Sequence, residues 1–120
     1  FQNDLEGTIA KYSIIQNARL YRDHIAVAVS SAPVNRVVAA QAADELLNII
    51  GIDTSFVLYP DGDRVIVSAR SIGEVNVQVI LEKLGGGGNA AAAGGQIPDK
   101  SLTQVAQELA QAIDQYLEDE

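Results

Sequence analysis

Two groups of residues in this chain have the types and the spacing to bind an anion. The first is the run Gly85-Gly86-Gly87-Gly88, followed by Asn89 and by alanines and glycines up to Gln96. Glycines bring backbone N–H groups close to phosphate oxygens because no Cβ intervenes, although the same composition is typical of a flexible linker. The run is not a P-loop, because no Lys-Ser or Lys-Thr follows it. We therefore interpret it as a candidate phosphate cradle, with a linker as the alternative.

The second group is Ser68, Arg70 and Ser71. A guanidinium can grip a phosphate through two parallel N–H groups. Alternation along an expected strand at 64–70 places Ser68 and Arg70 on the same face. Ser71 and Glu74 have the spacing of a capping box, so we expect a helix to begin there, with its anion-attracting N-terminus beside Arg70. The alternative is an ion pair between Arg70 and a surface carboxylate, with the serine serving only as a cap.

Composition narrows the classes of function. The chain has 120 residues, 8 basic and 16 acidic, for a net charge of −8, which disfavours binding to nucleic-acid backbones. Cysteine is absent, and His24 is the single histidine, without an obvious acid or nucleophile as partner. We therefore expect no catalytic residue and no metal site in this chain. Without an apolar run of membrane-spanning length, we also expect a soluble fragment with no direct membrane contact.

The apolar pattern predicts the elements that position these groups. Helical segments are expected within 4–22 with a break at Gly7, an amphipathic helix at 35–50, a helix at 71–84 and a last helix beginning at a Ser101–Gln104 capping pattern. Strands are expected at 25–30, 54–59, 64–70 and 90–97, the middle two forming a hairpin. This order predicts an α/β fold, with a mixed β-sheet flanked by helices in a single small domain.

Several segments together resemble one known family. They are Ala42–Leu47, Ser55–Val57, Ser68–Gln78 and Glu82–Gly88. The chain is similar to the DHH-associated domain of the membrane-anchored cyclic-di-AMP phosphodiesterases of the DHH superfamily. The resemblance implies a substrate-binding domain at 25–120 and, at 1–24, a connector from an upstream catalytic domain.

The resemblance also implies a function. In this family the upstream DHH domain holds two Mn²⁺ ions, whose water opens cyclic-di-AMP to linear pApA, while the associated domain closes over the cleft. Ser68, Arg70 and the glycine backbone would contact the phosphate or the adjoining nucleotide. The implied partners are cyclic-di-AMP or pApA and the upstream domain, and a homodimer is compatible with them. The parent would lie at the cytoplasmic side of the cell membrane, and this fragment would bind no Mn²⁺ and be inactive alone.

The chain departs from the family pattern directly after the glycines. That pattern continues with His, two variable residues, Asn-Ala-Ala, one more residue and Gln. Here Asn89 stands in place of the His and Ala92-Ala93-Gly94 in place of Asn-Ala-Ala, while Gln96 is kept. Because Asn carries no positive charge, we hypothesise weaker phosphate binding than in a relative with the His. The alternatives are a catalytically degenerate nucleotide-binding module and a nucleic-acid-acting relative of the exonucleases, the latter disfavoured by the acidic charge.

Overall fold

Helices and strands alternate along the chain. A computed structural model describes residues 4–119. Its helices are α1 (Leu5–Gln16), α2 (Arg36–Leu46), α3 (Val77–Glu82) and α4 (Leu102–Glu118). Its strands are β1 (Arg19–Tyr21), β2 (Ile25–Val29), β3 (Thr54–Asp61), β4 (Arg64–Ser71), β5 (Gly87–Gly88) and β6 (Ala92–Pro98).

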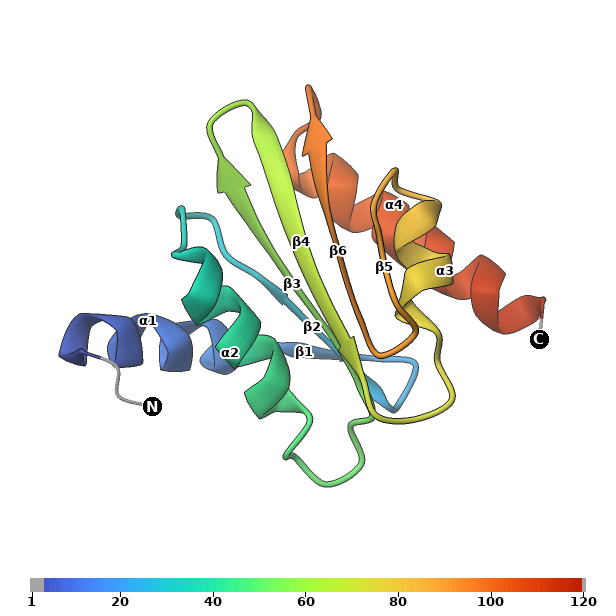
Figure 1. Cartoon of the computed structure of the whole chain (residues 1–120), viewed down its shortest axis with the longest axis horizontal. Coiled ribbons are helices and arrows are strands. Elements are labelled where there is room, and N and C mark those ends of the chain that lie inside the picture. Colours follow the sequence, from blue (N-terminus) through green and yellow to red (C-terminus); the bar gives the residue numbers. More distant parts are fainter. Residues whose placement is uncertain (1–3, 120) are drawn as a thin grey trace.

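The strands of the described part form one six-stranded sheet in the order β1-β2-β3-β4-β6-β5 (Figure 1). Strands β2 and β3 are parallel and are joined by the α2 crossover, whereas the other neighbouring strands are antiparallel. The predicted α/β class, a mixed sheet flanked by helices in a single small domain, is confirmed. No helix within residues 4–119 is both long enough and apolar enough to cross a membrane.

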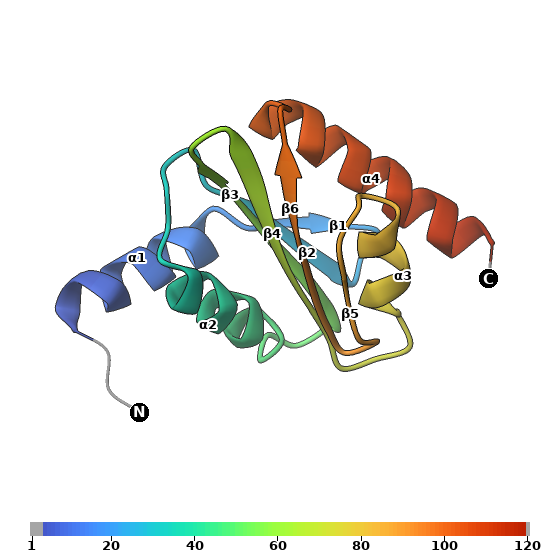
Figure 2. The ribbon, with the colours of Figure 1, turned by 45° about the horizontal axis from the view of Figure 1, so that its top comes forward.

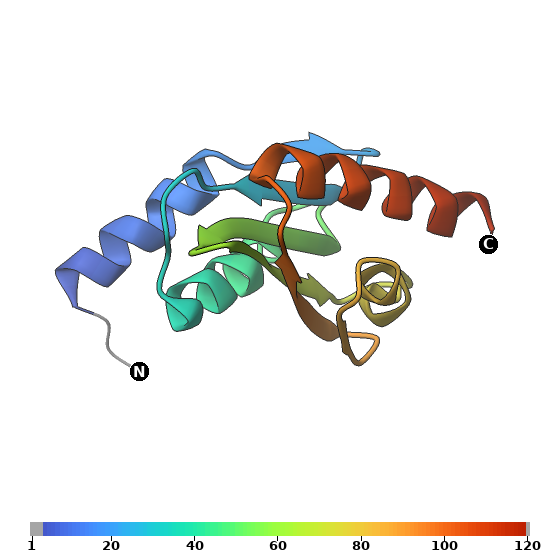
Figure 3. The ribbon, with the colours of Figure 1, turned by 90° about the horizontal axis from the view of Figure 1, so that it is seen from above.

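The sheet separates two apolar layers (Figure 3). On one face α3 and α4 pack against Phe56 and Leu58 of β3, and on the other face α1 and α2 pack against Val57 and Tyr59. Strand β3 is therefore buried on both sides, as its nearly continuous apolar sequence requires. Strand β4 alternates instead, because its α1–α2 side is only half-covered.

Helix α2 has a capped start, packs closely on the sheet and ends earlier than expected. Asn35 caps the helix by accepting hydrogen bonds from the N–H groups of Val37 and Val38. The hydroxyl of Ser55 on β3 donates to the carbonyl of Ala43 over 2.6 Å. The helix ends at Leu46 rather than at residue 50, and the exposed Ile50 shows that no core remains there to bury another turn.

The N-terminal segment differs from the expectation of a broken helix. Helix α1 runs without interruption through Gly7, because the Asp4 side chain caps it by accepting a hydrogen bond from the Gly7 N–H over 2.7 Å. Strand β1, which was not predicted, pairs with β2, and α1 packs on α2. The division into a connector at 1–24 and a domain at 25–120 stays a prediction, and residues 1–3 and 120 lie outside the described part.

The helix expected at Ser71 begins later, so the Ser71–Glu74 capping box is wrong. Ser71 is the last residue of β4, where it pairs with Thr54 and its N–H donates to the carbonyl of Ala91. The strand ladder therefore holds the backbone that would have started the helix. Asn76 caps α3 instead, accepting a hydrogen bond from the N–H of Val79. The second pattern is confirmed, because Ser101 accepts a hydrogen bond from the N–H of Gln104 and caps α4.

Candidate functional site

Half of one sheet face is left uncovered by helices. Helix α2 packs against β3 and β4, while β6 and β5 extend beyond it on the same side (Figures 1 and 2). A pocket of about 770 Å³ lies on this open half. Its lining comes from α2 and the segment before it, the β3–β4 hairpin, and the three open strands: Pro33, Val34, Arg36, Ala40, Tyr59, Pro60, Asp61, Ile66, Val67, Ser68, Arg70, Gly87, Gly88, Ala92, Ala93, Gly94, Gly95 and Gln96.

Ser68 and Arg70 both line the pocket, on the shared face of β4 that the alternation predicted. Arg70 is held from two sides: its Nε donates to Asp44 Oδ1 over 3.1 Å, and one terminal nitrogen donates to the Ala69 carbonyl over 2.9 Å. The same terminal nitrogen lies 3.5 Å from the Ser68 hydroxyl. The ion pair with a surface carboxylate, which the sequence left as an alternative, is therefore present. One terminal nitrogen of Arg70 remains for an anion.

The glycine run is a strand edge rather than a flexible linker. Gly87 and Gly88 form β5, paired with Gly94 and Ala93 of β6. A Cβ on Gly88 would lie 2.5 Å from the Ala92 carbonyl oxygen, so close strand packing demands glycine there. A Cβ on Gly87 would meet nothing within 4 Å. Gly87 faces open space on the pocket side, and its missing side chain leaves room for a ligand.

Four residues proposed from sequence do not line the pocket. Ser71 is buried on the opposite face of β4, where its hydroxyl accepts a hydrogen bond from the N–H of Gly73. Gly85 follows α3 with a φ of +88°, and the Gly86 N–H donates to the Leu81 carbonyl. The Asn89 side chain bends back on its own turn and accepts hydrogen bonds from the N–H groups of Ala91 and Ala92. These four residues therefore lie outside the pocket lining.

Sequence reasoning missed Arg36. It is the first residue of α2 and lines the pocket from the helix side. A usable signal was present, because residues four apart on a helix share a face, which brings Arg36, Ala40 and Asp44 together. Gln96, noted only for its agreement with the family pattern, also lines the pocket, and its Oε1 accepts a hydrogen bond from Arg64 over 2.6 Å.

Two further residues of the pocket, Asp61 and Tyr59, interact with nearby arginines. Asp61 pairs with Arg64, with 3.2 Å between Oδ2 and the guanidinium. Burial raises the pKa of the Tyr59 phenol, the charge of Asp61 adds to that rise, and Arg36 opposes it. Arg36, Tyr59 and Asp61 therefore share one end of the pocket.

The described residues show no cluster of metal-ligating side chains. Within residues 4–119 no group of three or more His, Asp and Glu side chains could hold an ion. His24 lies away from the pocket, with its Nδ1 2.9 Å from Asp53 Oδ1, and Asp53 also accepts a hydrogen bond from the Thr54 hydroxyl. The chemistry available at the pocket is therefore binding by guanidinium, hydroxyl and backbone groups.

Comparison with known proteins decides the family. A model of the DHHA1 domain matches residues 23–119. The chain is a DHHA1 domain. The resemblance to the DHH-associated domain is confirmed, and the glycine strand, Arg70 and α2 are all within the matched part of this DHHA1 domain.

The DHHA1 domain has close relatives among phosphodiesterases. The cyclic-di-AMP phosphodiesterase PdeA of Listeria monocytogenes is 37% identical over 118 residues, which cover 96% of this chain and 18% of PdeA. The cyclic-di-AMP phosphodiesterase GdpP of Bacillus subtilis is 41% identical over 121 residues, covering 95% of this chain and 18% of GdpP. This DHHA1 domain thus spans less than a fifth of the length of either relative.

Its fold also occurs in solved structures. An exopolyphosphatase-related protein from Bacteroides fragilis superposes with a TM-score of 0.84 at 19% identity, covering 96% of this chain and 36% of that protein. At this identity the likeness concerns the fold alone.

Proposed function

We propose that this DHHA1 domain is the substrate-gripping part of a cyclic-di-AMP phosphodiesterase, which opens cyclic-di-AMP to linear pApA. One observation carries the proposal: the open half of the sheet has a pocket lined by Ser68, Arg70 and the glycine strand. The relationship to PdeA and GdpP supports the choice of ligand. The acidic net charge of −8 argues against nucleic acid as the main substrate.

In that reaction the role of this domain is to bind and orient the dinucleotide. The free terminal nitrogen of Arg70 donates to a phosphate oxygen, and the Ser68 hydroxyl offers a second donor. Gly87 lets the nucleotide approach the strand backbone. The residues that the structure describes include no cluster of metal ligands, so we assign the Mn²⁺ of the parent enzyme to an upstream DHH domain and expect this domain alone to be inactive. The parent's location at the cytoplasmic side of the cell membrane belongs to the same proposal.

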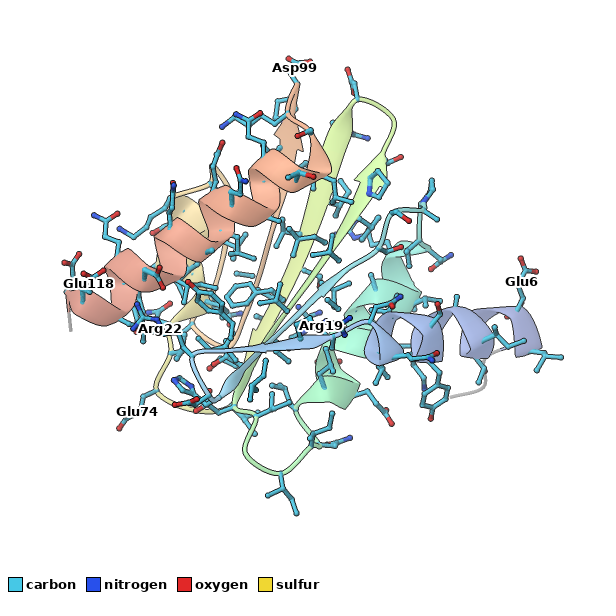
Figure 4. All side chains as sticks on the ribbon, turned by 180° about the vertical axis from the view of Figure 1, so that it is seen from behind. Glu6, Arg19, Arg22, Glu74, Asp99 and Glu118 are labelled. Atoms are coloured by element: carbon cyan, nitrogen blue, oxygen red, sulfur yellow. The ribbon has the colours of Figure 1, made fainter. Side chains whose placement is uncertain are left out.

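Nuclear magnetic resonance on the ¹⁵N-labelled 120-residue chain tests the binding role. Cyclic-di-AMP and pApA are expected to shift the backbone amides of Gly87, Gly88 and Gly94 together with the Arg70 Nε–H signal. Arg70→Gln should weaken binding about tenfold, because it removes a charge-assisted hydrogen bond. Arg19→Gln is the matched control: it removes one positive charge from β1, and Figure 4 shows Arg19 from the side opposite to the view of Figure 1. Shifts confined to other residues, or an Arg70→Gln variant that binds normally, would contradict the proposal.

A second candidate, a nucleotide-binding module that has lost hydrolysis, is favoured by Asn89 at the position of the family's His. The full-length parent protein distinguishes the two, because an enzyme converts cyclic-di-AMP to pApA when Mn²⁺ is added. A parent that holds cyclic-di-AMP without turnover supports the degenerate module.

A further inference from the structure

The two arginines that line the pocket differ in how many of their N–H groups already donate hydrogen bonds within the protein. Arg70 has its Nε on Asp44 and one terminal nitrogen on the Ala69 carbonyl. Arg36 is exposed and, within residues 4–119, makes no hydrogen bond or ion pair. Arg36 therefore has its whole planar fork of donors available, which is the arrangement that grips a phosphate through two N–H groups.

Asp61, an acidic residue of the pocket lining, forms its ion pair with Arg64 and not with Arg36. Asp61 is bound to Arg64, which also donates to Gln96, so its carboxylate is already compensated. The N-terminus of α2 itself is occupied, because Asn35 Oδ1 accepts the N–H groups of Val37 and Val38. The available anion-binding group at this end is consequently the Arg36 side chain and not the helix backbone.

The two guanidiniums reach the pocket from different elements, Arg36 from the start of α2 and Arg70 from β4. Arg36 begins the helix, and Asp44, which holds Arg70, follows two turns later. At a rise of 1.5 Å per residue, the two anchoring positions are about 12 Å apart along the helix axis. Ala40 lies between them and also lines the pocket, where its small side chain leaves the space open. The pocket thus has a cation toward each end and room between them.

Two cations that line one pocket from different elements suit a ligand with two separate anionic groups. We infer that Arg36 binds the terminal phosphate of a linear dinucleotide whose internal phosphate lies at Arg70, an inference that rests on the proposed function. A terminal phosphate carries close to two negative charges at neutral pH, whereas an internal diester carries one. Arg36, the arginine without a hydrogen bond among the described residues, therefore binds the more highly charged terminal phosphate. The domain would hold phosphorylated linear pApA more tightly than ApA, its analogue without the terminal phosphate.

The test compares pApA with ApA on the 120-residue chain, by nuclear magnetic resonance titration that follows the arginine Nε–H signals. Arg36→Gln should weaken pApA binding about tenfold and change ApA binding less than about twofold. Arg36→Lys, which keeps the charge but loses the fork, should recover only part of the pApA affinity. Arg19→Gln, on β1 outside the pocket, should change neither affinity, and the spectra without ligand check that each variant is folded.

The outcomes separate this inference from the proposed function. If Arg36→Gln leaves pApA binding unchanged, or weakens pApA and ApA equally, the terminal-phosphate role is overturned while dinucleotide binding stands. If the unmodified chain binds neither pApA nor ApA, the proposed function fails and the inference falls with it. If Arg36→Gln weakens the binding of pApA but not that of ApA, both the inference and the proposed function are supported.

Discussion

Arg70 Nε donates to Asp44 Oδ1 over 3.1 Å and so joins β4 to α2 at the edge of the pocket. The pair fixes the guanidinium plane beside the open sheet, but it also puts a carboxylate next to the proposed phosphate position. Arg70 is therefore a positioned cation whose attraction for an anion is partly offset by Asp44, whereas Arg36 makes no ion pair with the described residues. Because of this difference, a substitution that changes the surroundings of Arg70 should change the affinity of the pocket for an anion.

Asp44→Asn is expected to strengthen binding of inorganic phosphate by about threefold, because it removes a negative charge near the anion while its amide oxygen can still accept from Arg70. Asp44 is largely exposed to solvent and Arg70 is partly exposed, so the free energy of unfolding should change by less than about 1 kcal/mol. Isothermal titration at low salt measures the first quantity and urea unfolding the second.

Asp44→Ala is the companion variant, because it also removes the hydrogen bond that orients Arg70. It should gain less affinity for phosphate than Asp44→Asn. If Asp44→Asn weakens phosphate binding instead, the charge of Asp44 is required and the interpretation is wrong.

Gly87→Ala and Gly88→Ala should have opposite consequences. The added methyl of Gly87→Ala meets no atom, so stability should stay within about 0.5 kcal/mol, while dinucleotide affinity falls because the methyl enters the pocket. Gly88→Ala would put a Cβ 2.5 Å from both Ala92 O and Ala93 Cα, at a φ of +145°. It should lower the free energy of unfolding by about 1–3 kcal/mol.

Urea unfolding and nuclear magnetic resonance titration of both variants check the two glycine predictions. Loss of stability in Gly87→Ala would contradict the view that this glycine serves the ligand rather than the fold.

Asn89→His tests the hypothesis that the residue after the glycines weakens phosphate binding. The His should increase phosphate affinity, most strongly below about pH 6.5 where it is protonated. It should also cost about 0.5–1.5 kcal/mol of stability, because Asn89 Oδ1 now accepts two backbone N–H groups of its turn. Titration calorimetry at two pH values measures the affinity, and an unchanged value would overturn the hypothesis.

Asp114 should make stability depend on pH at the acid end. Hydrogen bonds from Tyr21 and then Arg22 lower the pKa of Asp114, against the opposing effect of burial. Figure 4 labels Arg22 in the turn after β1, beside α4. Because the unfolded chain takes up the proton first, near about pH 4, the contribution of Asp114 is present above that pH and is lost as pH falls through the lowered pKa.

Asp114→Asn should therefore lose less stability than the unmodified chain between about pH 5 and pH 2, as measured by urea unfolding at each pH. The hydrogen bond to Asp114 also raises the pKa of Tyr21, so a second contribution is present below about pH 10 and is lost as pH rises through the raised value. Asp119→Asn, near the end of the same helix, controls for net charge. Equal acid dependence in all three proteins would contradict the prediction.

Local pattern in the sequence determined much of the fold. Alternation along β4 predicted that Ser68 and Arg70 share a face, and the polar spacing of α2 and the Ser101 cap predicted two helices, because these features depend on residues close together in the chain. The family resemblance was equally readable, since its motifs are contiguous. The Ser71 cap failed because strand pairing with Thr54, a partner far along the chain, competed with helix formation.

Only the tertiary structure decided which residues meet. The sequence indicated glycines for phosphate, yet strand β6 packs so close to Gly88 that strand pairing itself demands the glycine, whereas a side chain at Gly87 would enter open space. Arg36 joined the site because α2 crosses the sheet beside the open strands, a placement set by packing of Val38 and Ala42 on β3. Periodicity fixes which face a side chain takes, but the distance between two faces depends on how the whole core packs.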